Sequence, residues 1–153
     1  MLLQLLFIFA LIPASAFMSY WARRANVQGF ELWLPFSIIL SFGISPWAGF
    51  VFAMTVVFIS WAVFPYELQG LLIMALCLLP TLLASSLFSL SEAGFVQSAM
   101  LLTLAYNLVS NAAYLLMMGN WFNAMKFFAF SMWVSWLLYS NFGWQMVTWL
   151  SSG

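Results

Sequence analysis

Long apolar runs alternate along this chain with short stretches that contain proline, glycine or polar residues. A transmembrane helix needs about 20 mainly apolar residues, a length that most of these runs reach. Pro46 suits the first turn of a helix, where its missing N–H costs no hydrogen bond, and Gly119 with Asn120 is typical of a helix end. The pattern predicts an all-α integral membrane protein, a polytopic helical bundle in which one domain covers residues 1–153. The expected spans are 2–20, 30–42, 46–64, 71–90, 95–118 and 123–150.

The second segment is the irregular part of this pattern. At residues 30–42 it is about 20 Å long by the helical rise. The hydrocarbon core of a bilayer is ~30 Å thick, and Gly43 to Pro46 interrupts the helix before it can extend further. Residues 30–64 therefore form two spans, a short hairpin that enters and leaves by one face, or one broken helix. We expect six crossings joined by short loops, whereas a single crossing by 30–64 gives five.

Charged residues gather where the chain leaves the apolar runs. The stretch SYWARRANVQGFELW, residues 19–33, holds two of the three basic residues and one of the three acidic ones. With six spans, the same face collects Arg23, Arg24 and Lys126. Because basic residues favour cytoplasmic loops, we predict that these three charges set the topology and that both termini lie on the opposite side. The loops predicted to be cytoplasmic are 21–29, 65–70 and 119–125.

Composition supports a membrane protein and argues against chemistry within this chain. Hydrophobic residues make up 67% of the sequence and charged residues 4%, against roughly 25% charged in a soluble domain. There is no histidine for haem iron or catalytic zinc, and the single Cys77 leaves no pair of thiols. We therefore predict no catalytic, cofactor-binding or metal site, and no enzyme. The net charge of zero gives no reason to expect a nucleic-acid partner.

Bulky aromatic residues predict contact with lipid. Bound lipid is expected, and a quinone or carotenoid has room on a surface rich in tryptophan, although no cofactor is predicted. The tryptophans that form this surface are Trp133, Trp136, Trp144 and Trp149.

The acidic residues lie at the predicted ends of spans, so they are interpreted as turn or cap residues. They are Glu31, Glu67 and Glu92.

The densest polar pattern lies in the fifth segment, TLAYNLVSNAAY. Its polar residues recur at spacings of three and four, so they share one face of a helix. Facing lipid, two asparagine amides would remain largely without hydrogen bonds, which predicts that the stripe faces another helix, a water-filled cavity or a ligand. It serves either as a hydrogen-bonded helix contact or as a wall of a polar solute site. This stripe comprises Thr103, Tyr106, Asn107, Ser110, Asn111 and Tyr114.

Two weaker patterns predict helix packing. Hydroxyl groups at Ser131, Ser135 and Tyr139 recur every four residues along the sixth segment. Small residues are paired four apart, Ala10 with Ala14 and Gly49 with Ala53, and such pairs let membrane helices approach closely.

Two functions of different kinds fit these observations. The first is a small non-catalytic subunit that packs within, and stabilises, a larger membrane complex, with other integral membrane subunits and lipid as its partners. The second is a solute-binding component of a transporter that takes a small polar solute. Six short-looped segments in about 150 residues, with an irregular second one, resemble the layout of the substrate-binding components of energy-coupling-factor transporters and of the cell-shape protein MreD. That resemblance implies a transport role in which the stripe on the fifth segment contacts the solute.

Overall fold

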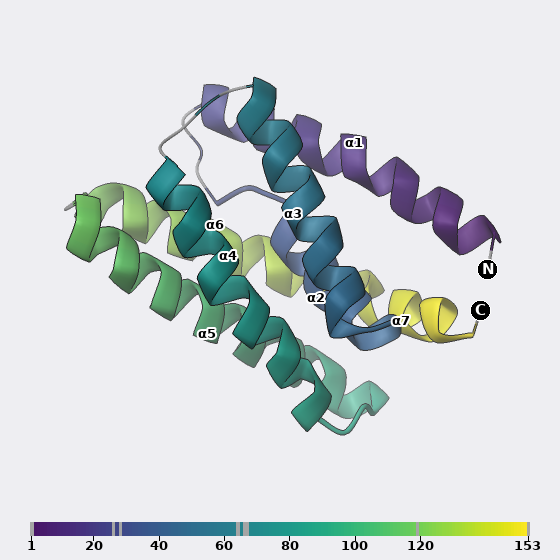
Figure 1. Ribbon diagram of the computed structural model, residues 1–153. Coiled ribbons are helices and arrows are strands. Elements are labelled where there is room, and N and C mark those ends of the chain that lie inside the picture. Colours follow the sequence, from purple (N-terminus) through teal and green to yellow (C-terminus); the bar gives the residue numbers. More distant parts are fainter. Residues whose placement is uncertain are drawn as a thin grey trace.

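The computed structural model describes residues 2–25, 27, 29–63, 65, 68–118 and 120–152, and the described part of the chain is helical without strands (Figure 1). With the 3-10 turn counted as part of α4, the helices end within four residues of the predicted boundaries. The predicted all-α bundle with a short second segment is therefore confirmed. The elements are α1 (Leu2–Arg24), α2 (Trp33–Gly43), α3 (Pro46–Val63), α4 (Leu68–Leu83), the 3-10 turn η1 (Ala84–Leu87), α5 (Glu92–Met118), α6 (Trp121–Leu138), the π-helical turn η2 (Tyr139–Gly143) and α7 (Trp144–Ser151).

Within the part of the chain that the structure describes, four helices are long and apolar enough to cross a membrane, which indicates membrane insertion. They are α1, α3, α4 together with η1, and α5. At 11 residues, α2 is shorter, about 17 Å by the helical rise. The elements α6, η2 and α7 follow one another without a break from Trp121 to Ser151 and form the sixth predicted segment.

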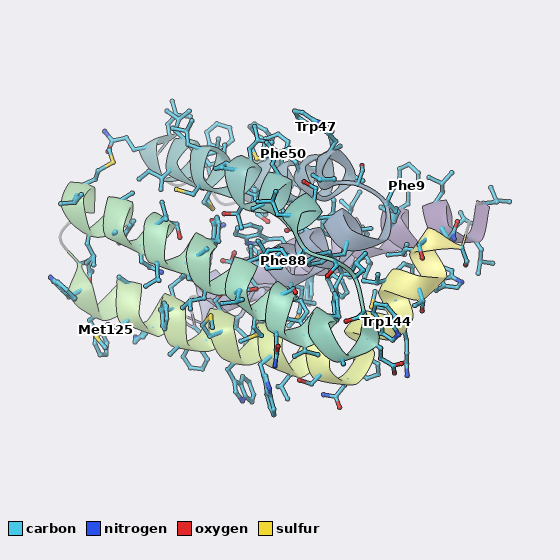
Figure 2. All side chains as sticks on the ribbon, turned by 90° about the horizontal axis from the view of Figure 1, so that it is seen from below. Phe9, Trp47, Phe50, Phe88, Met125 and Trp144 are labelled. Atoms are coloured by element: carbon cyan, nitrogen blue, oxygen red, sulfur yellow. The ribbon has the colours of Figure 1, made fainter. Side chains whose placement is uncertain are left out.

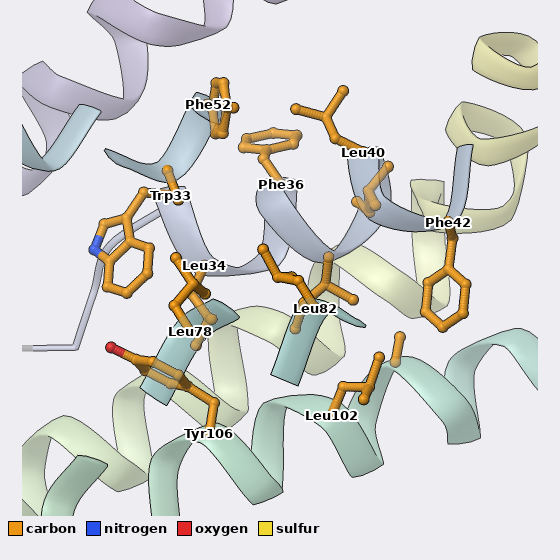
Figure 3. Packing of buried hydrophobic residues seen from close by; sticks show 14 of the residues in the cluster. Trp33, Leu34, Phe36, Leu40, Phe42, Phe52, Leu78, Leu82, Leu102 and Tyr106 are labelled. Atoms are coloured by element: carbon orange, nitrogen blue, oxygen red, sulfur yellow. The ribbon is translucent and has the colours of Figure 1, made fainter. Parts of the chain in front are cut away.

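The short helix α2 is the centre of the bundle. All 11 of its residues are buried, and it contacts α3, α5, α6 and α7 among others. A helix that is apolar on every face lies either among other helices or in lipid, and here neighbouring helices cover all of α2. Figure 3 shows its residues Trp33, Phe36 and Leu40 among side chains of the surrounding helices. The core therefore forms around α2, whose last residue, Gly43, lies against Leu150 of α7.

Close backbone contact joins α2 to α3. A Cβ atom placed on Gly49 would overlap the carbonyl oxygen of Ser37 and come within 3.2 Å of the backbone nitrogen of Ser41. Ala53, four residues further along α3, is also fully buried. The predicted Gly49–Ala53 pair thus faces a helix.

The other predicted small-residue pair faces outward. Ala10 and Ala14 are both exposed on α1, so this pair does not bring two helices of the chain together. Packing of α1 is mainly against α3. At its beginning, Gln4 donates hydrogen bonds to the carbonyl oxygens of Trp149 (2.8 Å) and Leu150 (3.4 Å) at the end of α7. The beginning of α1 and the end of α7 are therefore in direct contact, and the two ends of the described chain lie close together (Figure 1).

A π-helical turn aligns the buried face of the last segment. Buried residues recur every four positions, at Ser131, Ser135, Tyr139, Gly143 and Val147. In a regular α-helix each step of four residues rotates the face by about 40°, because 3.6 residues complete a turn. The wider π turn at Tyr139–Gly143 offsets part of this rotation. The turn therefore keeps α6 and α7 facing the same core.

Candidate functional site: a polar seam between α5 and α6

The structure turns the polar stripe of α5 toward the interior of the bundle. Thr103, Tyr106 and Asn107 are fully buried, and Ser110 is 7% exposed. Asn111 and the residue at the far end of the stripe, Tyr114, are half-buried. The polar side chains of the stripe are therefore inaccessible at mid-helix and partly accessible toward the end of α5.

Hydrogen bonds connect this stripe to α6 and to the first residue of η2, across an antiparallel contact. The Thr103 hydroxyl donates to the carbonyl of Ala99 at 2.9 Å, so the Tyr139 hydroxyl, also 2.9 Å away, is placed to donate to Thr103. One turn along α5, Asn107 Nδ2 donates to Ser131 Oγ at 3.1 Å. We call the group Thr103, Asn107, Ser131, Ser135 and Tyr139 the α5–α6 seam.

The amide of Asn107 has a fixed orientation. Its nitrogen also donates to the carbonyl oxygen of Thr103 at 2.9 Å. Exchanging the amide oxygen and nitrogen would set two acceptors against each other at that distance, so the orientation follows from the hydrogen bonds. Both amide hydrogens of Asn107 are then used within the seam.

One buried polar atom of the seam, Asn107 Oδ1, meets no hydrogen-bond partner in the described part of the chain, and its residue is 0% exposed. An unsatisfied buried polar group costs about 1–3 kcal/mol. On α6, Ser135 is also fully buried, one turn from Ser131 and one turn from Tyr139, and its hydroxyl lies beside the Tyr139 hydroxyl. The hydroxyl groups of Ser135, Tyr139 and Thr103 therefore follow one another within the interface.

The half-buried end of the stripe is bonded differently. Asn111 Nδ2 donates to the carbonyl oxygen of Asn107 at 2.7 Å, within α5 itself. Ser110 reaches the same carbonyl at 3.5 Å. Such bonds to the preceding turn need no second helix. Asn107 thus makes the interhelical contact, whereas Asn111 donates its hydrogen bond within its own helix.

A partly buried ion pair, which no pattern in the sequence predicted, lies just before the start of α2. Arg23 Nε is 3.7 Å from Glu31 Oε1, with the two side chains 15% and 9% exposed. The indole nitrogen of Trp33 donates to the other oxygen of Glu31. Trp33 in turn packs edge-to-face on Tyr106, with ring centroids 5.7 Å apart. The charged loop is therefore connected through one aromatic pair to the polar stripe of α5.

The other predicted topology charges lie nearer the surface. Arg24 is exposed and donates to the hydroxyl of Tyr20 at 2.8 Å. Lys126 lies 4.4 Å from the centre of the Phe122 ring. Glu92 is exposed at the first turn of α5. Glu67 and parts of the three predicted loops, at residues 26, 28, 66, 67 and 119, lie outside the described residues.

A separate open groove of about 380 Å³ runs along the outside of α5 and α6. Methionine and leucine side chains dominate its lining, and no residue of the polar stripe takes part. Such a surface suits a lipid acyl chain better than a polar solute. Its lining residues are Gln97, Met100, Leu101, Leu104 and Met132.

Metal binding finds no support in this geometry, since the described residues bring together no group of three or more Cys, Asp or Glu side chains. Comparison with known proteins gives no relative from which a function follows. No protein-family model matches this sequence, and no curated protein or solved structure is significantly similar to it. Function is therefore inferred from the fold and from the seam.

Proposed function

We propose that this protein is a small non-catalytic integral membrane subunit that packs within, and stabilises, a larger membrane complex. The observation that carries the proposal is the distribution of polar and apolar groups. Thr103 bonds to Tyr139 and Asn107 bonds to Ser131 within the bundle, whereas large apolar side chains point outward (Figure 2). Among these outward side chains are Phe9, Trp47 and Met125, which are 68%, 59% and 66% exposed.

The outer face of α1 is the surface that best suits a partner helix. Ala10 and Ala14 are exposed between two large side chains, Phe9 and Phe17. In membranes, packing between helices favours small residues because lipid is as apolar as leucine and gives no hydrophobic drive to association. A partner helix can approach α1 closely at these two alanines.

Gentle extraction of the native membrane, followed by size determination and mass spectrometry, tests this proposal. We expect the chain to migrate in stoichiometric amounts with other integral membrane proteins. Ala14→Phe, which fills the space on α1, is expected to weaken co-migration, whereas Ala105→Phe on the exposed face of α5 serves as the matched control. A folded, monodisperse 17.4 kDa chain that migrates alone would contradict the subunit role.

A second candidate function is the binding of a small polar solute as part of a transporter. The half-buried positions of Asn111 and Tyr114 favour it, because the stripe is accessible at that end. If the protein binds such a solute, thermal unfolding in detergent should shift upward with one member of a library of neutral polar compounds. The shift should disappear in Asn111→Leu and persist in Asn141→Leu, which changes an exposed asparagine on the π turn. No shift for any compound would count against this role.

For the orientation, we propose that the end of the bundle carrying Arg23, Arg24 and Lys126 lies in the cytoplasm. The support is the positive-inside rule. In a Cys77→Ser background, Ser152→Cys should react with a membrane-impermeant maleimide on intact cells, and Asn120→Cys should react only after permeabilisation. Both replaced side chains are exposed. The opposite labelling pattern would reverse the orientation.

A further inference from the structure

The open groove along α5 and α6 is polar at one end and apolar over the rest of its length. Its lining residues on α5 recur at spacings of three and four, so they form one strip of the helix surface. The strip begins with the exposed amide of Gln97 and ends at Leu104, about 10 Å further along the helix axis. Two apolar residues, Met100 and Leu101, lie between them, and Met132 of α6 completes the lining.

The α6 wall of the groove is attached to the α5–α6 seam. Asn107 Nδ2 donates weakly to Met132 Sδ at 3.9 Å. Asn107 is fully buried and also bonds to Ser131, the neighbour of Met132 in the sequence. The groove is therefore part of the α5–α6 contact, with one wall positioned by the polar groups behind it.

The polar end of the groove lies where the outside of the bundle becomes polar. Because α5 and α6 are antiparallel and Thr103 bonds to Tyr139, Gln97 lies at the level of η2 and α7. Exposed side chains on α6 include Trp133 and Trp136, whereas most of those from residue 140 onward are polar. Polar groups avoid hydrocarbon, so Gln97 lies nearer the lipid headgroups than Leu104 does. The exposed polar residues are Ser140, Asn141, Gln145, Thr148, Ser151 and Ser152.

The charges at this end of the bundle select the kind of headgroup. Among the described residues, Glu92 in the first turn of α5 is the one charged side chain here, about 7.5 Å along the axis from Gln97. The basic residues lie at the opposite end, in the last turn of α1 and the first two turns of α6. An anionic headgroup would meet only the negative charge of Glu92, whereas an ammonium group is attracted to that carboxylate.

We propose that the α5–α6 groove binds one acyl chain of a zwitterionic phospholipid whose headgroup carries an ammonium group. The Gln97 amide donates a hydrogen bond to a phosphate or ester oxygen, and the Glu92 carboxylate attracts the ammonium. The acyl chain extends from there between Leu104 and Met132. This site holds whether or not the chain joins a larger complex.

Photo-cross-linking of the full chain in vesicles tests the proposal. The vesicles contain equal parts of phosphatidylcholine and phosphatidylglycerol, with a trace of either lipid carrying a diazirine on one acyl chain. We expect the choline probe to label residues 100–104 and Met132 severalfold more than the glycerol probe does. A diazirine near the ester should label closer to Gln97, and one near the methyl end closer to Leu104.

Matched variants separate the groove from the rest of the surface. Leu101→Trp fills the groove and should lower labelling of Met132 severalfold. Val109→Trp is the control, because Val109 is 58% exposed against 54% for Leu101 and lies outside the groove on the same helix. Glu92→Gln should bring the two probes closer to equal labelling, whereas Lys126→Gln at the opposite end should leave their ratio unchanged.

Three results would overturn the proposal. Labelling spread evenly over the exposed apolar residues of α5 would show bulk lipid only. Equal or stronger labelling by the glycerol probe would refute the ammonium headgroup, and a reversed order of the two diazirine positions would refute a headgroup at Gln97. Because the wild-type chain decides each case, a variant that fails to fold does not prevent the test.

Discussion

Replacing Gly49 by alanine tests whether α2 is held at the centre by backbone contact with α3. The added methyl group would overlap the carbonyl oxygen of Ser37, and backbone atoms cannot rotate away as a flexible side chain can. To reach the ~3.3 Å of a close carbon–oxygen contact, the two helices must separate by about 1 Å. Because all of α2 is buried, that shift disturbs its packing on the other helices as well.

The expected cost is at the upper end of the range for overpacking, about 3 kcal/mol. For a chain of this length, this corresponds to a decrease in Tm of about 6–12 °C. We would measure Tm from tryptophan fluorescence and far-UV circular dichroism of the purified protein in detergent.

Gly94→Ala is the matched control for this substitution. A Cβ atom at Gly94 would lie 2.9 Å from Ser91 Oγ, and that side chain can rotate. The gain of about 0.5–1 kcal/mol from replacing a helical glycine offsets the loss of the capping contact from Ser91. We therefore expect a change within about 1 kcal/mol. If Gly49→Ala melts as the control does, α2 and α3 do not pack backbone to backbone and the central position of α2 is refuted.

Further substitutions test the polar contacts by the same unfolding assay. Glu31→Ala removes the carboxylate that pairs with the half-buried Arg23 and accepts from the Trp33 indole, and should cost about 1–3 kcal/mol. Glu92→Ala on the surface should cost less than about 1 kcal/mol. Equal effects would show that the pair at Glu31 is solvated. Asn107→Leu loses one interhelical bond, about 0.6 kcal/mol on average, but Asn107→Asp places a charge at mid-helix and should cost about 2.5–3.5 kcal/mol. Similar values for the two would mean that Asn107 is not in an apolar interior. Gln4→Leu should leave Tm nearly unchanged and accelerate amide hydrogen exchange in residues 2–8, and unaltered exchange would show that the contact with α7 does not hold α1.

The helical segments could be predicted from the sequence because a membrane restricts the chain to few solutions. Backbone groups in lipid must bond within the same segment, so each long apolar run becomes a helix. The sequence of α2, WLPFSIILSFG, already indicates a central position, because this segment is apolar on every face and too short to cross a bilayer. The choice among the three interpretations of residues 30–64 depends on where the membrane lies along the bundle, which no local pattern in the sequence contains.

The half of the candidate site that lies on α5 could be predicted from the sequence, but its pairing with the next helix could not. The spacing of Thr103 and Asn107 places them on one face, and the structure shows that face buried. Their partners on α6 also form a visible pattern, but the pairing of Thr103 with Tyr139 depends on the register of two antiparallel helices. The ion pair of Arg23 with Glu31 was missed because both residues were assigned to span ends, where solvent satisfies a charge. Their separation by eight residues across the loop before a short helix was the available signal.

Polar residues in this chain determine which of many apolar packings forms. Leucine against lipid and leucine against leucine differ little in free energy, so apolar contact alone scarcely favours one register of two helices over another. A slip of one residue along α6 rotates its face by about 100°. Such a slip would separate Ser131 from Asn107 and Tyr139 from Thr103, and would leave each of these groups unsatisfied in an apolar interior. A few polar residues are therefore enough to specify one fold, because each polar group buried between helices would lose its hydrogen bond in any other register of those helices.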